Sequence, residues 1–89
     1  MVFGYRKLNR ALKELISKAK ETALPQKDIT SAEEFVEYGE PLLALEQLVE
    51  QLFEFSIPIS AELYDAVEQC GILMDMPADK YFYLKELIK

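Results

Sequence analysis

The clearest pattern of polar and apolar positions lies between residues 39 and 60, which read GEPLLALEQLVEQLFEFSIPIS. At about 100° per residue, its apolar side chains occupy half of a helical circumference, and acids and amides occupy the other half. The apolar positions, all expected to face a core, are Leu42, Ala44, Leu45, Leu48, Val49, Leu52, Phe53 and Phe55. The polar positions are Glu46, Gln47, Glu50, Gln51 and Glu54. The pattern predicts a central helix that opens at Glu40-Pro41 and ends before residue 57.

Helical periodicity also marks the chain before this segment. Apolar residues recur at three- and four-residue steps between Leu8 and Ala19, which predicts a first helix from about residue 3 to residue 23. Leu24-Pro25 ends it, because the residue before a proline avoids helical angles. We expect a loop over residues 26–29 and then a short helix that starts at residue 30 or 31. Both positions begin a capping box, and Gly39 suits the end of the helix.

The remaining chain continues the helical pattern. Ile57-Pro58-Ile59 breaks the central helix, and its isoleucines are expected to plug one end of the core. Ser60 is the expected cap of a fourth helix. A last helix is predicted from Pro77 to about residue 88. No segment alternates with period two, so we predict an all-α fold, a small bundle of four to five helices, as one domain over residues 1–89.

Charge is unevenly distributed. The chain carries a net charge of −6. Residues 1–20 hold six basic side chains and one acid, a balance of +5, whereas residues 21–89 hold four basic side chains and fifteen acids, a balance of −11. The acidic part argues against nucleic acid as a direct ligand, because phosphates need a positive surface. The basic first helix suits an anionic membrane surface or, the interpretation we favour, contact with the acidic part of the same chain.

The residues for catalysis are largely missing. The chain has no histidine, the commonest general base and metal ligand. Its one cysteine, Cys70, lies on an apolar stripe and has no CxxC partner. Neither a metal-ligand motif nor a glycine-rich phosphate loop is present, and the paired carboxylates fall on predicted exposed arcs. We therefore expect no enzymatic activity, no cofactor, no metal and no small-molecule substrate.

The localisation is expected to be cytoplasmic. The first residues, MVFGYRKLNR, contain no apolar run of signal-peptide length. No stretch approaches the ~18 apolar residues of a membrane span, so no membrane partner is expected.

Two surface features stand out. Seven glutamates and no lysine or arginine occur within residues 33–54. Such a run is either an ordinary solvated face or a docking surface for a basic partner. Three aromatics, Tyr81, Phe82 and Tyr83, stand consecutively and cannot all face one core. We expect the first two to pack and Tyr83 to cover the edge.

An ordered set of motifs resembles the MafI-type and related contact-dependent growth inhibition immunity proteins of bacteria. The likeness is carried by Gly39-Glu40, by the LALE sequence at 43–46, and by the Ile57-Pro58-Ile59-Ser60 turn, with Leu48, Leu52 and Glu54 between them. It covers residues 30–76 well and the first helix only in general character. Much of the set is apolar and so reports fold more than function.

The resemblance implies an immunity protein that binds and neutralises a cognate toxin domain, commonly an RNase or tRNase, whose basic surface it covers. Combined with the charge pattern, it suggests a toxin-binding cluster of Glu37, Glu40, Glu46, Glu50 and Glu54, with Glu33, Asp75 and Asp79 as lesser candidates. The alternative is a small acidic adaptor that grips an amphipathic partner helix, for which Leu43 and Tyr83 become the important residues. A third possibility, a nucleic-acid mimic that blocks another DNA-binding protein, shares the same charge logic.

Overall fold

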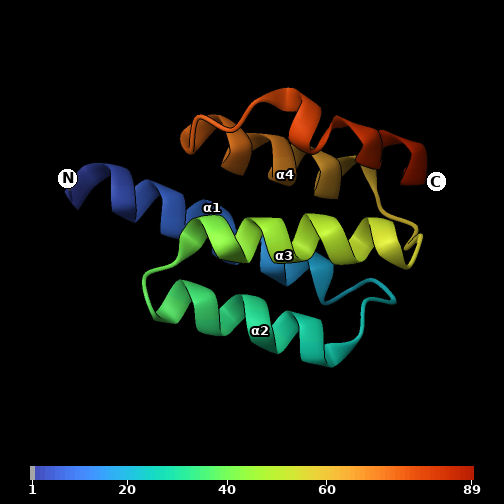
Figure 1. Cartoon of the computed structure of the whole chain (residues 1–89), viewed down its shortest axis with the longest axis horizontal. Helices are drawn as coiled ribbons and strands as arrows, with labels where there is room; N and C mark the ends of the chain where they lie inside the picture. Colours follow the sequence, from blue (N-terminus) through green and yellow to red (C-terminus); the bar gives the residue numbers. More distant parts are fainter. Residues whose placement is uncertain (1) are drawn as a thin grey trace.

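Four α-helices and two short 3-10 segments form the part of the chain that the computed structural model describes, residues 2–89, with side chains from residue 6 onwards. The elements are α1 (Val2–Ala19), α2 (Gln26–Glu37), α3 (Pro41–Glu54), α4 (Ala61–Leu73), η1 (Ala78–Lys80) and η2 (Phe82–Leu87). α2 packs mainly on α3, and α1 packs mainly on α4. Figure 1 shows α3 across the centre, with α2 on one side of it, α4 and the C-terminal segment on the other, and α1 behind. The prediction of an all-α bundle of four to five helices is confirmed.

All four α-helices and η2 contribute fully buried side chains to one core. The largest of these are Leu12, Leu15, Ile29, Leu45, Leu48, Leu52, Leu63, Val67, Cys70 and Leu84. Ile57 and Ile59 are buried, as expected for the end of the core. The backbone N–H of Ile59 donates to the carbonyl of Leu87 at 3.0 Å, and the N–H of Lys89 donates to the carbonyl of Ile59 at 3.1 Å. These two bonds tie the C-terminal segment to the loop between α3 and α4.

Three helices end in the same backbone motif, in which one residue adopts a left-handed conformation and the next N–H donates back to the last turn. After α2 this residue is Gly39, at φ 77°, as expected. After α3 it is Ser56, at φ 50°, and after α4 it is Asp75, at φ 55°. Ile57 donates to the carbonyl of Leu52 after α3, at 3.0 Å. The turn between α2 and α3 is thus relaxed, whereas the other two hold side chains in a conformation that glycine prefers.

The predicted boundaries of the first two helices are wrong. α1 ends at Ala19 rather than near residue 23, because the Thr22 hydroxyl donates to the carbonyl of Ala19 at 2.6 Å and closes a turn. α2 begins at Gln26, directly after Pro25, and not at residue 30 or 31. Packing explains the difference: Asp28 and Ile29, expected in a loop, are buried against the core. That burial outweighs the local preference expressed by the capping boxes.

The predicted last helix is also wrong in type. The C-terminal segment consists of η1 and η2, which are 3-10 turns. Tyr81, Leu84 and Leu87 are buried at a three-residue spacing, which matches the three residues per turn of a 3-10 helix. Its rise of about 2.0 Å per residue also lets a short chain reach farther than an α-helix would. The two hydrogen bonds with Ile59 fix where the end of this segment lies.

The apolar arc of α3 is narrower than the sequence predicted. Leu42, Phe53 and Phe55 are 46%, 44% and 47% exposed. The first two lie at the edge of the arc, at nearly the same angle around the helix axis as Glu46. Phe55 follows the last helical residue, so the helical period no longer places it. Of the consecutive aromatics, Tyr81 is buried as expected, but Phe82 is 52% exposed and Tyr83 is the half-buried one.

Candidate functional site

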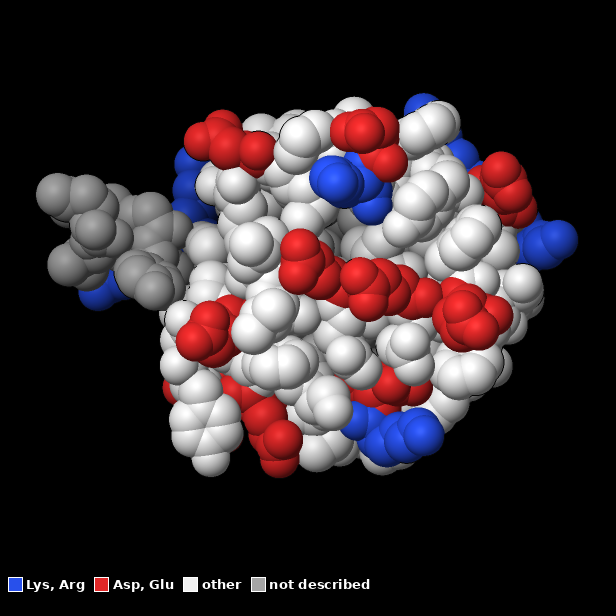
Figure 2. All heavy atoms as spheres, viewed as in Figure 1, with Lys and Arg blue, Asp and Glu red and all other residues white. Residues whose placement is uncertain are grey.

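The outer side of α3 carries a row of three glutamates that we call the α3 acidic row. It consists of Glu46, Glu50 and Glu54, at i, i+4 and i+8. Glu50 and Glu54 are exposed and Glu46 is half-buried. α3 contains no lysine or arginine, and within residues 6–89 no ion pair reaches any of the three. Figure 2 shows acidic side chains across the middle of the molecule, over α3, uninterrupted by basic ones. This part of the predicted cluster is therefore brought together and is open to solvent.

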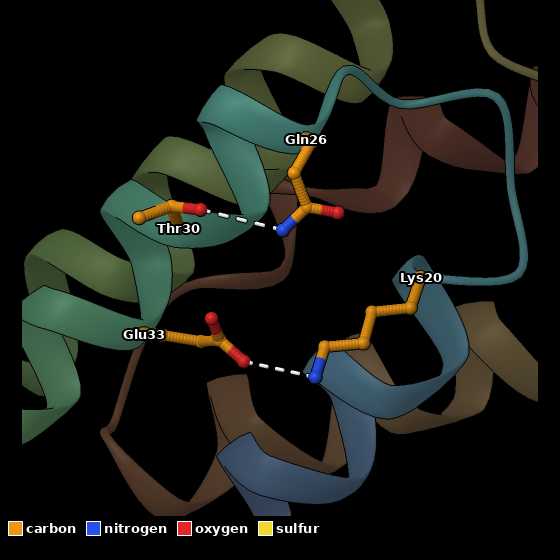
Figure 3. A network of polar contacts seen from close by, with 4 residues as sticks. All are labelled: Lys20, Gln26, Thr30 and Glu33. Carbon is orange, nitrogen blue, oxygen red and sulfur yellow. Dashed lines mark hydrogen bonds and ion pairs between the residues drawn. The ribbon is translucent and has the colours of Figure 1, made fainter.

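The acids of α2 are in a different setting. Glu33 forms an ion pair with Lys20 of α1, Oε2 to Nζ 2.9 Å (Figure 3). Glu37 lines a hollow between α1 and α2 together with Lys13 and Lys20. The expectation that the basic first helix faces acids of the same chain is thus met here. Glu33, one of the lesser predicted candidates, has an internal countercharge.

Glu40 stands apart from both groups. It is exposed and occupies the N-cap position of α3, in the turn after α2. The run of glutamates that is continuous in sequence is therefore divided in space into α2 acids beside lysines, a corner at Glu40, and the α3 acidic row.

A groove runs between α3 and the segment that follows α4, with a volume of about 370 Å³. We call it the α3 groove. Its apolar lining comes from Leu42, Val49, Met74, Met76, Pro77 and Tyr83. Its charged lining is Glu46, Glu50, Asp75 and Lys80. Tertiary structure thus brings Asp75 to the two glutamates from the opposite wall, whereas Asp79, also predicted, is exposed on η1 and does not line the groove.

Aromatic side chains lie beside Tyr83 of the α3 groove. The ring centroids of Phe53 and Tyr83 are 4.6 Å apart, and those of Phe82 and Tyr83 are 6.5 Å apart. The pKa of Tyr83 is raised above its ordinary value of 10.0 by burial and, second, by the negative charge of Glu50. An aromatic cluster therefore adjoins the α3 acidic row. Phe53, which the periodicity predicted to face the core, is exposed. The aromatics at 81–83 predicted that one of their own rings lies outside the core, but not that Phe53 lies beside them.

The amides of α3 have a structural role that the sequence analysis did not detect. Gln47 and Gln51 were placed on the solvated arc, but both are half-buried. Each Nε2 donates to Oδ1 of the buried Asp28, at 2.9 Å and 3.1 Å. Oδ2 of Asp28 has no hydrogen-bond partner. The contact fixes α3 against α2 on the side of α3 away from the groove.

Carboxylate clusters and the single cysteine are the two kinds of group that the sequence offered as sites of chemistry. No group of three or more Asp, Glu or Cys side chains in the described residues is arranged to hold a metal ion. Cys70 is fully buried, as expected, and burial raises the pKa of its thiol to about 12. The thiol is thus protonated at neutral pH and is not a nucleophile.

Within residues 2–89, none of the helices has both the length and the apolar character that crossing a membrane requires.

Comparison of the chain with protein-family models, curated proteins and solved structures found no match. The likeness to immunity proteins therefore rests on the sequence motifs alone, and the geometry of α3 and its groove is the independent basis for a functional conclusion.

Proposed function

We propose that this protein is an immunity-type inhibitor that binds a basic protein toxin and covers its substrate-binding surface. The observation that carries the proposal is the α3 acidic row, whose glutamates form no ion pair within residues 6–89. Each like-charge pair at i, i+4 costs an isolated helix about 0.2–0.5 kcal/mol. Stability alone gives no reason for such a row, whereas a cationic partner would remove the cost on binding.

The mechanism we propose is occlusion rather than catalysis. A nuclease needs a positive groove for phosphates, and an acidic helix competes for that groove. The field of the row attracts a basic protein over about a Debye length, roughly 8–10 Å at ordinary ionic strength, and speeds encounter. The aromatic cluster of Phe53, Phe82 and Tyr83 supplies the kind of side chain that dominates binding energy at protein interfaces. In this proposal the inhibitor acts in the cytoplasm of the cell that makes it.

The test pairs this chain with the C-terminal domain of the protein encoded immediately upstream. Production of that domain alone is expected to stop growth of a bacterial host, and co-production of this chain is expected to restore it. The two purified proteins should associate at least about tenfold faster at low than at high ionic strength. An upstream domain that is harmless or does not bind would contradict the proposal.

Charge-neutralising variants locate the surface. Replacing Glu46, Glu50 and Glu54 together by Gln should slow association and flatten its salt dependence. The matched control is Glu21→Gln, Glu62→Gln and Asp65→Asn, which removes the same charge from exposed positions around hollows beside α1 and α4. Equal behaviour of the two triple variants would show that net charge, not this surface, governs binding.

The apolar lining of the α3 groove supports a second candidate, an adaptor that holds an amphipathic partner helix. Of the two residues predicted for that function, Tyr83 lines the groove, whereas Leu43 is exposed but does not line it. The salt response separates the two: binding by apolar contact alone should change little with ionic strength.

A further inference from the structure

We propose that the α3 groove is the docking site for an arginine side chain of the partner protein. The inference deepens the proposed function and rests on it, in that the partner is a basic protein. It adds the place of contact and the residue type that is recognised there.

The lining of the groove suits the stem of a long cationic side chain. Val49 is buried, and Met74 and Met76 are half-buried beside it. Arginine and lysine bury their methylene stems along apolar surface while the charged head stays near polar groups. Thioether side chains adapt their shape to such a stem. A volume of about 370 Å³ is ample for one long side chain.

The charges around the groove select a cation. Glu46 and Glu50 approach from successive turns of α3, and Asp75 approaches from the opposite wall. Lys80 is the one basic residue of the lining, and within residues 6–89 it forms no ion pair with any of the three carboxylates. The lining therefore keeps a net charge of −2. Because carboxylates line both walls of the groove, a cation between the walls is attracted from both sides.

Arginine fits this arrangement better than lysine. Its planar guanidinium carries five N–H donors and can serve two carboxylates at once, whereas the lysine ammonium is a compact, strongly hydrated point charge. Tyr83 also lines the groove, and an aromatic ring attracts a guanidinium that contacts it. The groove thus offers apolar side chains to the arginine stem, carboxylates to the guanidinium, and an aromatic ring in contact with it.

The first experiment uses the isolated chain with small probes. Isotope-labelled protein is titrated with N-acetyl-arginine amide and followed by amide chemical shifts, with N-acetyl-lysine amide and the neutral N-acetyl-citrulline amide as comparisons. Shifts confined to residues 42–53 and 74–83, stronger for arginine than for the other two, are the expected result. Shifts spread equally over all acidic positions, or equal for arginine and lysine, would overturn the inference.

A matched pair of substitutions tests the position of the charge. Asp75→Asn removes one carboxylate from the groove, and Asn tolerates the left-handed backbone at φ 55°. Asp79→Asn makes the same charge change outside the groove. We expect Asp75→Asn to weaken arginine-amide binding about threefold, the effect of a partly exposed ion pair, and Asp79→Asn to leave it unchanged. Equal effects of the two variants would contradict the inference.

The same pair separates this inference from the proposed function. If the triple Gln variant of the α3 acidic row weakens toxin binding but Asp75→Asn and Asp79→Asn act alike on it, the inhibitor function stands and the arginine site fails. If the upstream domain does not bind at all while arginine amide still prefers the groove, the proposed function fails and the site stands.

Discussion

Glutamates occur on both α2 and α3, adjacent helices of one hairpin, yet Glu33 and Glu37 of α2 lie in a different electrostatic setting from the α3 acidic row. Glu33 of α2 pairs with Lys20, and Glu37 shares a hollow with lysines of α1. In the α3 acidic row, Glu46 and Glu50 share the α3 groove with Lys80, but no ion pair joins them within residues 6–89, and much of the groove lining is apolar. The difference shows that a glutamate becomes a candidate for binding through what the fold places beside it. Charge density along the chain does not reveal this.

The largest expected effect comes from the contact between Gly71 of α4 and Tyr81 of the C-terminal segment. Tyr81 packs so closely on Gly71 that an added Cβ would lie 2.6 Å from its ring. Gly71→Ala should therefore destabilise the fold by about 1–3 kcal/mol, the usual cost of overpacking, as measured by denaturant unfolding. In a Tyr81→Leu background the same substitution should cost less, because the ring is gone. Equal costs in the two backgrounds would mean that another contact is responsible.

Variants at Asp28 test whether its hydrogen bonds with Gln47 and Gln51 hold α3 in its orientation against α2. Asp28→Ala leaves the amide donors of Gln47 and Gln51 without their shared acceptor, so we expect a loss of about 1–2 kcal/mol in the free energy of unfolding. Asp28→Asn keeps one acceptor oxygen and should cost less. Chemical denaturation of the two variants provides the measurement. If Asp28→Ala is as stable as the parent, the orientation of the α3 acidic row does not depend on this contact.

The C-terminal ends of α2 and α3 also differ, in the residue that adopts the left-handed backbone conformation. α2 ends at Gly39, but α3 ends at Ser56, which has a positive φ. Ser56→Gly removes that strain and should stabilise the protein by about 0.5–1 kcal/mol, after the extra entropy of glycine in the unfolded chain is subtracted. Thermal unfolding measures the gain. Ser60→Gly, at a normal N-cap position whose hydroxyl binds the N–H of Leu63, should not stabilise.

The sharpest form of the comparison is one substitution made on each helix. Glu33→Gln removes an exposed ion pair and should lower stability by less than about 0.5 kcal/mol. Glu50→Gln relieves repulsion from Glu46 and Glu54 and should raise stability by a similar amount. The expected signs are opposite, and both shrink in high salt. Denaturant unfolding at two salt concentrations provides the data, and equal signs would remove the distinction between the two helices.

The smallest effect is on the titration of Tyr83. Burial and then Glu50 raise its pKa above 10.0, so Glu50→Gln should lower that pKa toward the ordinary value without reaching it. Because the folded-state pKa is raised, the neutral phenol favours the fold below about pH 10, and this contribution is lost as the pH rises through the folded-state value. Ultraviolet titration follows the phenolate. Glu33→Gln serves as the control and should leave the Tyr83 titration in place.

Periodicity predicted most of the fold because it is a local property. The buried face of α3, the cap at Ser60, the glycine end of α2 and the buried isoleucines around Pro58 all follow from spacing and from single-residue preferences. The start of α2 and the 3-10 form of the C-terminal segment do not. They depend on Asp28 and Ile29 packing against the core and on Leu87 and Lys89 bonding to Ile59, contacts between residues distant in sequence.

The sequence by itself determined an all-α chain, a core made from helical stripes, and a central helix with one apolar and one acidic side, because helix geometry converts spacing directly into faces. Only the tertiary structure decided which glutamates form an ion pair and which do not, because the partner of Glu33, Lys20, comes from α1. It also placed Asp75, which follows α4, in the same groove as Glu46 and Glu50. The exposure of Phe53 and the presence of the α3 groove also became known only from the tertiary structure. A groove forms only where separate elements leave space between them, and no single helix contains that information.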